Sequence, residues 1–465
     1  MIAAIPMQVQ LDLTNQWAGS SNAHPIGVAV TLILGAALLL VPRRWAPLPI
    51  LMLACFVPSG QRIVIATLDF SFLRVMVILG WLRVFINGEY GGFRRHSMDV
   101  ATVLFNIVGI LAFWSLRGTS AALVYSLGNS LDTLGTYFLF RLLIRDWVDL
   151  DRVIRSIAWI ALPVAVAFMF ERVTGRNPFS VLGGVPEITV VRQGRLRCQG
   201  AYSHPILAGC FWASLAPLIA AGWWRARSAR GGVVFALICT VAIVFFCASS
   251  TPVLGLGFAF VGGAAWFIRY RLRMLRWGIV FTLFGLHLVM KAPVWHLISR
   301  VSAVGGSTGW HRYHLIDSAI RRFPEWAARG VVSTRHWGFG LGDVTNQYIA
   351  EGKRAGILGL ILFVIIIAYA YRGVGRIWRR VRHSKYRVAM AWALGASLLV
   401  HSACFIGVTY FGQILLVWNM TLAAIASLEL RTQQEARAAR ARRRAEFAQA
   451  ELEPALQQGA APVAS

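Results

Sequence analysis

About thirteen long apolar runs limit what this chain can fold into more than any other feature of its sequence. A helix that crosses a bilayer needs roughly 20 apolar residues, because the hydrocarbon core offers its backbone no hydrogen-bond partner. We therefore expect an all-α fold, a polytopic transmembrane helical bundle of about 12–13 spans. Pro58, Gly60 and Arg62 interrupt the second run, so a full crossing of that segment stays open. The runs have the approximate bounds 26–42, 47–66, 68–86, 98–116, 121–143, 153–171, 204–223, 231–249, 251–269, 275–293, 355–371, 388–406 and 410–429.

The composition excludes a soluble globular protein. Apolar residues make up 57% of the chain and charged residues only 14%, against about 25% charged in an average soluble protein. The formal net charge of +27 would point to nucleic acid in a soluble chain. Here the basic residues separate apolar runs, so we expect contacts with membrane lipids and no nucleic-acid partner. The six cysteines form no CxxC pair, and we expect neither a metal nor a cofactor.

The arginines of the short loops fall on alternate loops, and therefore on one side of the predicted bundle. The positive-inside rule makes the arginine-rich side cytoplasmic. This places residues 1–25 as an N-terminal extracytoplasmic segment, 26–429 as the transmembrane domain, and 430–465 as a charged cytoplasmic tail. Two long loops, 172–203 and 294–354, then lie on the outer face. The arginine-rich loops contain Arg43/Arg44, Arg94/Arg95, Arg145/Arg152/Arg155, Arg225/Arg227/Arg230, Arg269/Arg271/Arg273/Arg276 and the run from Arg372 to Arg387.

Both long outer loops are basic where the rule predicts few positive charges. Within the second loop, apolar residues recur at helical spacing from Leu315 to Phe323 and stop at Pro324, which predicts a short amphipathic helix. Arg312 lies at the start of that helix, where exposed backbone N–H groups add to its attraction for anions. The loop arginines are Arg172, Arg176, Arg192, Arg195 and Arg197 in the first loop, and Arg300, Arg312, Arg321, Arg322, Arg329, Arg335 and Arg354 in the second.

The stretch 195–208 reads R-L-R-C-Q-G-A-Y-S-H-P-I-L-A. Arg195 and Arg197 precede a turn at Gly200 and a span that begins at His204. Arginine can bind phosphate oxygens through two parallel hydrogen bonds, so these side chains suit a pyrophosphate at headgroup depth. Contact with ordinary lipid phosphates is the alternative interpretation.

The stretch 337–359 reads W-G-F-G-L-G-D-V-T-N-Q-Y-I-A-E-G-K-R-A-G-I-L-G. Its glycines permit a tight backbone path that delivers Asp343, Thr345 and Asn346, and Glu351 follows. The string lacks the strand and helix that flank a dinucleotide-binding loop. We expect these polar groups to hold a sugar hydroxyl instead.

The chain resembles the O-antigen ligase/polymerase family, polytopic bacterial transferases that move glycans from undecaprenyl pyrophosphate to an acceptor. The resemblance covers the span layout from roughly residue 25 to 430. Three motifs carry it. The first is the approach to a span with Arg197, Gly200, His204 and Pro205, and the second is Arg312 followed by Pro324, Gly340 and Gly342. In the third, nine residues separate Asn346 from a G-x-x-G pattern formed by Gly356 and Gly359.

The chain departs from the family at Thr345, which stands where the family has a histidine. That histidine is thought to activate the acceptor hydroxyl or to help bind the departing pyrophosphate. Threonine is not a base near neutral pH, so another group must take this role in an active enzyme. The nearby candidates are His311, His314, Asp343 and Glu351. We favour Asp343, because it leaves the glycine turn two positions before Thr345.

The resemblance implies a metal-independent, inverting glycosyl transfer at the periplasmic face of a bacterial inner membrane. The implied partners are an undecaprenyl-pyrophosphate-linked glycan, an acceptor glycan or lipid, membrane lipids and other polysaccharide assembly proteins. The implied catalytic residues are Arg197, Arg312 and Asp343, and the implied substrate-binding residues are Arg195, His204, His311, His314, Thr345, Asn346 and Glu351.

Two other functions stay open. One is a flippase or transporter for lipid-linked oligosaccharide, which we expect to show broken helices in two repeated halves. The sequence shows no such repeat, and its basic residues gather in a late outer loop. The other is a non-catalytic family member that assists assembly, which the missing histidine favours.

Overall fold

The computed structural model describes residues 21–65, 68–300, 308–381 and 383–459, with side chains as far as residue 446. The chain is 74% helical, which confirms the all-α prediction. Residues 1–20, most of the predicted N-terminal segment, lie outside the described residues.

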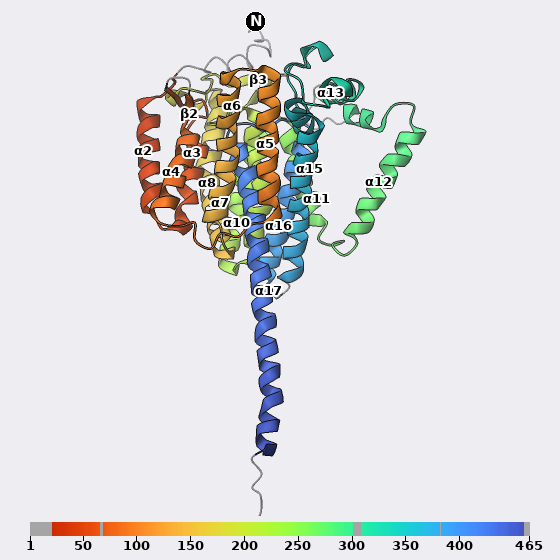
Figure 1. Cartoon of the computed structure of the whole chain (residues 1–465). Coiled ribbons are helices and arrows are strands. Elements are labelled where there is room, and N and C mark those ends of the chain that lie inside the picture. The colour runs from red at the N-terminus through yellow and green to blue at the C-terminus, as the bar shows by residue number, and fades with distance from the viewer. Residues whose placement is uncertain (1–20, 66–67, 301–307, 382, 460–465) are drawn as a thin grey trace, which may run out of the picture.

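Most helices of the described residues form one bundle (Figure 1). They are α2 (Pro25–Leu40), α3 (Pro47–Phe56), α4 (Phe72–Ile86), α5 (Ser97–Arg117), α6 (Ser120–Ser130), α7 (Thr136–Leu143), α8 (Trp147–Thr174), α9 (Pro205–Ala221), α10 (Arg230–Phe246), α11 (Ser250–Ala264), α12 (Leu272–Val289), α13 (Thr308–Arg321), α14 (Phe323–Trp326), α15 (Gln347–Arg380), α16 (Lys385–Cys404) and α17 (Ile414–Gly459). Short 3₁₀ turns lie at Arg43–Trp45, Pro178–Leu182, Gly222–Trp224, Arg227–Ala229, Val294–Arg300 and Arg335–Trp337.

Helix α9 forms the centre of the bundle. It is apolar on all faces, as a helix enclosed by other helices must be, and nearly all of its residues are buried. It packs against α8, α10, α11, α16 and α17. Phe211 and Trp212, in the middle of α9, are among the largest fully buried side chains.

Eight helices are long and apolar enough to cross a membrane, which supports part of the span prediction. They are Ser97–Arg117, Trp147–Thr174, Pro205–Trp224, Arg227–Phe246, Leu272–Val289, Gln347–Arg380, Lys385–Cys404 and Ile414–Glu446. Two shorter apolar helices, Pro25–Leu40 and Ser250–Ala264, also match predicted runs. The full number of 12–13 spans stays a prediction.

The predicted helix over 47–66 is wrong in its second half. Helix α3 ends at Phe56, and a ten-residue helix is only about 15 Å long. The chain then forms the antiparallel hairpin β1 (Arg62–Ile65) and β2 (Leu68–Ser71), so the next predicted run also starts as a strand rather than as a helix. An ion pair of 2.7 Å between Arg62 and Asp69 joins the two strands, which explains why polar residues lie inside both runs.

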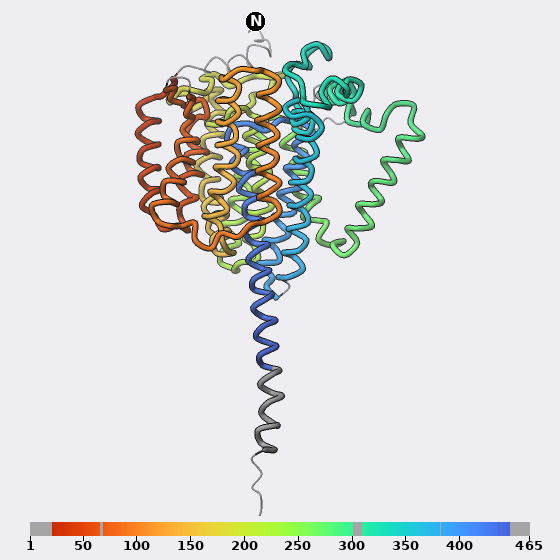
Figure 2. The backbone as a smooth tube through the Cα atoms, viewed as in Figure 1, coloured from red at the N-terminus to blue at the C-terminus, as the bar shows by residue number. Residues whose placement is uncertain are grey.

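Three other predicted runs differ in shape. The run 121–143 is interrupted by a π-helical turn, Leu131–Gly135, between α6 and α7. Helix α15 starts eight residues before the predicted run and is kinked at Ala355 and Gly356. Gly356 has φ of +65°, and a Cβ there would lie 2.7 Å from the Ala327 carbonyl oxygen, so only glycine fits. Helix α12 has no buried residue and stands apart from the bundle (Figure 2).

A second hairpin, β3 (Val190–Arg192) and β4 (Arg195–Arg197), lies at the same end of the bundle as α13 (Figure 1). We call this end the hairpin end. Helix α17 projects from the opposite end, which we call the tail end, and covers both the last predicted span and most of the predicted tail without a break.

Candidate functional site

The β3–β4 hairpin places three arginines on one face. Arg192 pairs with Arg195 across the strands, and Arg197 follows two positions later on the same side. The turn consists of Gln193 (φ 52°) and Gly194 (φ 71°), and two successive positive φ angles match the type I′ turn of tight hairpins. The side chain of Arg197 points into the protein and is only 5% exposed, whereas Arg195 at the tip is exposed.

The carboxylate of Glu171, at the end of α8, fixes the chain that follows this hairpin. It accepts hydrogen bonds from the backbone N–H groups of Gln199 (3.1 Å) and Gly200 (2.8 Å) and from the hydroxyl of Thr189 (3.1 Å). Gly200 has φ of +57°, and a Cβ there would lie 2.5 Å from the ring of Phe168, so the approach needs glycine. Glu171 is thus engaged by backbone rather than by an arginine.

Four arginines are buried in the described part of the chain, and they fall into two pairs. Arg83 bonds the carboxylate of Glu89 (2.7 and 3.1 Å), and Arg141 bonds that of Asp99 (3.0 and 3.1 Å). The other two buried arginines are Arg197 and Arg312. Among the described residues neither has a carboxylate partner, so both are positive charges that lack the usual compensation.

The side chain of Arg197 makes no hydrogen bond or ion pair within the described residues, and its Nε is buried without an acceptor. Burial lowers the pKa of Arg197 to about 10, and the positive charge of Arg192 contributes in the same direction. The guanidinium therefore stays charged at neutral pH. A buried, charged and unsatisfied donor set of this kind is completed by an anion.

Arg312, in the first turns of α13, donates one hydrogen bond of 2.8 Å from Nη2 to the hydroxyl of Thr251 at the start of α11. Gly407, between α16 and α17, lies beside it, since a Cβ there would be 3.3 Å from the Arg312 Nε. Burial lowers the pKa of Arg312, and Arg192 again lowers it further. Arg192 thus acts electrostatically on both buried guanidiniums, and we call Arg192, Arg197 and Arg312 the arginine cluster.

Sequence reasoning counted Arg192 among the loop arginines but did not assign it to the site. The signal was present: Gln193 and Gly194 form a two-residue turn, and such a turn pairs residue 192 with residue 195. Arg197 and Arg312 lie on different loops, and Arg192 acts electrostatically on both. Arg195 is the most exposed of the three arginines that the sequence assigned to the site, and it lies at the tip of the hairpin.

The glycine turn, residues 338–346, packs directly on α13. A Cβ at Gly338 would lie 2.7 Å from the Nε2 of His314, and one at Gly340 would lie 3.6 Å from the ring of His311. Glycine therefore lets the backbone approach both histidines. His314 also stacks on Trp310, with 5.0 Å between ring centroids.

Asp343 leaves this turn beside His311. Burial raises the pKa of Asp343 above its ordinary value, against the opposing attraction of His311 and Lys353. Burial lowers the pKa of His311, whose Nε2 is buried with no partner among the described residues. Desolvation thus outweighs the nearby positive charges at Asp343, and the site contains a carboxyl group with a raised pKa near an imidazole with a lowered pKa.

The remaining predicted site residues differ in whether their side chains make hydrogen bonds within the protein. Thr345 has a buried hydroxyl oxygen without a partner among the described residues. Asn346 caps α15: its Oδ1 accepts from the backbone N–H of Ile349 and its Nδ2 donates to the carbonyl of Ile406, both at 3.2 Å. Its side chain is therefore used in holding the glycine turn to the bundle.

Glu351 and His204 likewise have structural contacts. Glu351 accepts hydrogen bonds from Gln347 (2.6 Å) and Arg354 (2.8 Å), so its carboxylate is already compensated. His204 caps α9, since its Nδ1 accepts from the backbone N–H of Ile206 at 3.1 Å. Of the candidates for the catalytic base, Asp343, His311 and His314 make no side-chain hydrogen bond or ion pair among the described residues.

No protein-family model matches this chain, and no curated protein matches it.

The position of Glu171 yields a first prediction. Glu171→Gln exchanges one carboxylate oxygen for an NH₂ group that faces a backbone N–H donor. The loss of a charge-assisted hydrogen bond is worth about 1.5–3 kcal/mol, so we expect local opening to increase about ten- to a hundredfold. Hydrogen exchange of peptides that cover 189–201, followed by mass spectrometry, measures this. Glu187→Gln, which removes an exposed carboxylate of the same loop, is the control and should leave the exchange unchanged. Equal exchange in both variants would contradict the role of Glu171.

Proposed function

We propose that this chain is a membrane glycosyltransferase similar to the O-antigen ligases and polymerases. It would move or polymerise a glycan from undecaprenyl pyrophosphate onto an acceptor hydroxyl in surface or exopolysaccharide assembly. The observation that carries the proposal is the arginine cluster, because two of its guanidiniums are buried without a carboxylate partner among the described residues. Such a cluster is matched by a diphosphate.

The setting is a bacterial inner membrane, with the hairpin end at the extracytoplasmic face. Eight helices with the length and apolarity of membrane spans support the membrane location. The orientation rests on the alternating arginines of the short loops. A pyrophosphate on a polyprenyl chain presents its charge at headgroup depth, and the arginine cluster lies where α9 and α11 begin.

The arginine cluster would stabilise the leaving group. As the bond between the anomeric carbon and the diphosphate oxygen breaks, negative charge grows on that oxygen. Arg197 and Arg312 would donate to it, and Arg192 would add to the positive potential. The N-termini of α9 and α11 contribute in the same direction through their backbone dipoles. Such fixed electrostatic stabilisation is commonly the largest catalytic contribution, and guanidiniums provide it here without a role for a metal.

Asp343 would act on the acceptor. Its carboxylate takes the proton of the acceptor hydroxyl, whose oxygen attacks the anomeric carbon on the side opposite the diphosphate, with inversion. Its raised pKa makes the carboxylate a stronger base than an exposed aspartate. His311, which packs against the glycine turn, would orient the acceptor or the carboxylate. Asn346 and Glu351 would support the site through the fold.

A non-catalytic family member is the second candidate, favoured by Thr345 in place of the family histidine. A flippase is less well supported, because the unpaired guanidiniums gather at one end of the bundle rather than halfway along it. A deletion strain separates the three. Shortened glycan would indicate a polymerase, and complete glycan left on the lipid carrier a ligase. Lipid-linked units retained inside the cell would contradict the proposal and indicate a flippase.

The arginine cluster leads to a second prediction. Arg197→Ala and Arg312→Ala should each lower glycan output about 10²–10³-fold, because each removes a donor to the developing charge, and Arg192→Ala should lower it less, because it removes only positive potential. Arg197→Lys should recover only part of the activity, since an ammonium lacks the two-pronged guanidinium. Glycan from complemented deletion strains measures this.

The matched control is Arg176→Ala, an exposed arginine of the same loop. It should retain full output, and membrane insertion of every variant is checked by immunoblotting. Full output from Arg197→Ala and Arg312→Ala together would argue against transfer from a diphosphate.

The raised pKa of Asp343 gives a third prediction. A base must be deprotonated, so activity should fall as the pH drops through the pKa of Asp343, and this fall should occur above the ordinary value of 3.8. Asp343→Asn should abolish this fall at acidic pH and lower the rate about 10²–10⁴-fold. His311→Ala removes an attraction that favours the carboxylate, so the acidic limb should move to higher pH.

A transfer assay with purified enzyme at a series of pH values measures these effects. Asp317→Asn, which alters an ion-paired carboxylate of α13, serves as the control. If Asp343→Asn kept its activity while His311→Ala lost it, the base would be His311.

A further inference from the structure

A second basic site lies at the tail end, far from the arginine cluster. It is a pocket of about 200 Å³ between the α4–α5 loop, the end of α7 and the middle of α17. The described residues that line it include four arginines and no carboxylate. The lining residues are Gly91, Gly92, Phe93, Arg94, Arg141, Leu142, Arg145, Ser427, Leu430, Arg431 and Gln434.

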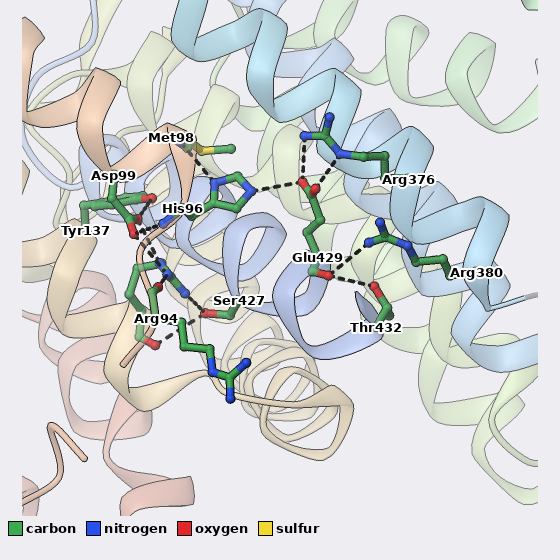
Figure 3. Close-up of polar contacts among 11 residues, drawn as sticks. Arg94, His96, Met98, Asp99, Tyr137, Arg376, Arg380, Ser427, Glu429 and Thr432 are labelled. Atoms are coloured by element: carbon green, nitrogen blue, oxygen red, sulfur yellow. Dashed lines mark hydrogen bonds and ion pairs between the residues drawn. The ribbon is translucent and has the colours of Figure 1, made fainter. Parts of the chain in front are cut away.

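The wall of this pocket is held in place from behind. Arg141, which is 5% exposed, bonds Asp99 with two nitrogens and donates from Nη1 to the Ser427 hydroxyl at 2.8 Å. Asp99 also accepts from the hydroxyl of Tyr137 at 2.6 Å. Figure 3 shows how these contacts join α5, α7 and α17. The charge of Arg141 is thus largely compensated, and its role is to fix the wall.

A neighbouring group of contacts holds α17 to α5 and α15. Glu429 lies 3.0 Å from the Nε2 of His96 and accepts from Arg376 at 3.1 Å (Figure 3). Glu429 lies between Ser427 and Leu430, which both line the pocket. Both sides of the pocket are therefore fixed before any ligand binds, which lowers the entropy lost on binding.

The other three arginines supply charge that the protein leaves largely uncompensated. Arg145 donates to the backbone carbonyls of Leu142 (2.8 Å) and Glu89, and the carboxylates that attract its charge, those of Glu89 and Asp149, are already ion-paired with other arginines. The guanidinium of Arg94 has no hydrogen bond or ion pair among the described residues (Figure 3). Arg431 has only an exposed contact of 3.1 Å with Glu435. The pocket is thus a preformed concave site with a net positive lining.

We propose that this pocket binds the phosphodiester headgroup of an anionic phospholipid. Guanidiniums match the oxygens of a phosphate, and Gly91 and Gly92 leave room for it to approach the backbone. Leu142 and Leu430 provide the apolar part of the lining, which suits the glycerol and the first acyl carbons. The pocket lies where α7 ends and the apolar part of α17 gives way to charged residues, which is the depth of a headgroup. The inference depends on the membrane setting of the proposed function but not on glycosyl transfer.

Lipid binding to the purified full-length protein tests this inference. The protein in dodecyl maltoside is mixed with phosphatidylglycerol, phosphatidylcholine or inorganic phosphate, and bound molecules are counted by native mass spectrometry. We expect phosphatidylglycerol to bind at least tenfold more tightly than phosphatidylcholine. Tighter binding of inorganic phosphate than of phosphatidylglycerol would overturn the lipid as the ligand.

A pair of double variants with equal loss of charge locates the binding. Arg94→Ala with Arg431→Ala removes two pocket arginines, and we expect it to lower phosphatidylglycerol affinity at least tenfold. Arg95→Ala with Arg440→Ala removes two exposed arginines outside the pocket and should bind as the wild type does. Equal affinity in the two double variants would overturn the site. Because the readout is binding alone, failure here leaves the glycosyltransferase proposal to its own tests.

Discussion

The burial of two uncompensated guanidiniums is the constraint on which the hairpin end depends. Removing a charge from water costs several kcal/mol unless an opposite charge meets it. Arg83 and Arg141 show how this chain normally meets that cost, with a carboxylate held by two hydrogen bonds. Arg197 and Arg312 have no such partner in the described residues. The surrounding fold must hold them in place, and an anionic ligand is the group that would complete them.

Arg197 and Arg312 lack a carboxylate partner because the nearby carboxylates bind backbone amides or other arginines. Glu171 binds the amides beyond the hairpin, and Glu351 binds Gln347 and Arg354. Asp343 is the carboxylate left near α13, and burial raises its pKa. The hairpin end thus contains a concentration of positive charge and a carboxyl group, that of Asp343, that makes no hydrogen bond or ion pair among the described residues. At the tail end a fully bonded network supports the pocket, so the two ends use arginine in different ways.

Much of the architecture could be predicted from the sequence because hydrophobicity is a local property. The helical class and eight of the apolar spans follow from run length alone. The prediction failed where a run was apolar but not helical, as after Phe56, because strand pairing between Arg62 and Ser71 depends on a partner segment. It also missed that α15 begins at Gln347, since Asn346 caps that helix while bonding a distant carbonyl.

The site divides in the same way. The sequence by itself determined which residues carry charge, including the arginines of both long loops, and it placed the glycine turn at residues 338–346. Only the tertiary structure decided which of them are buried, which are paired and which meet. Arg192 was added to the site because it acts on both buried arginines, whereas the side chains of Asn346 and Glu351 make hydrogen bonds within the fold. The physical reason is that charge belongs to a residue, but its solvation and its partners belong to the packing of segments far apart in the chain.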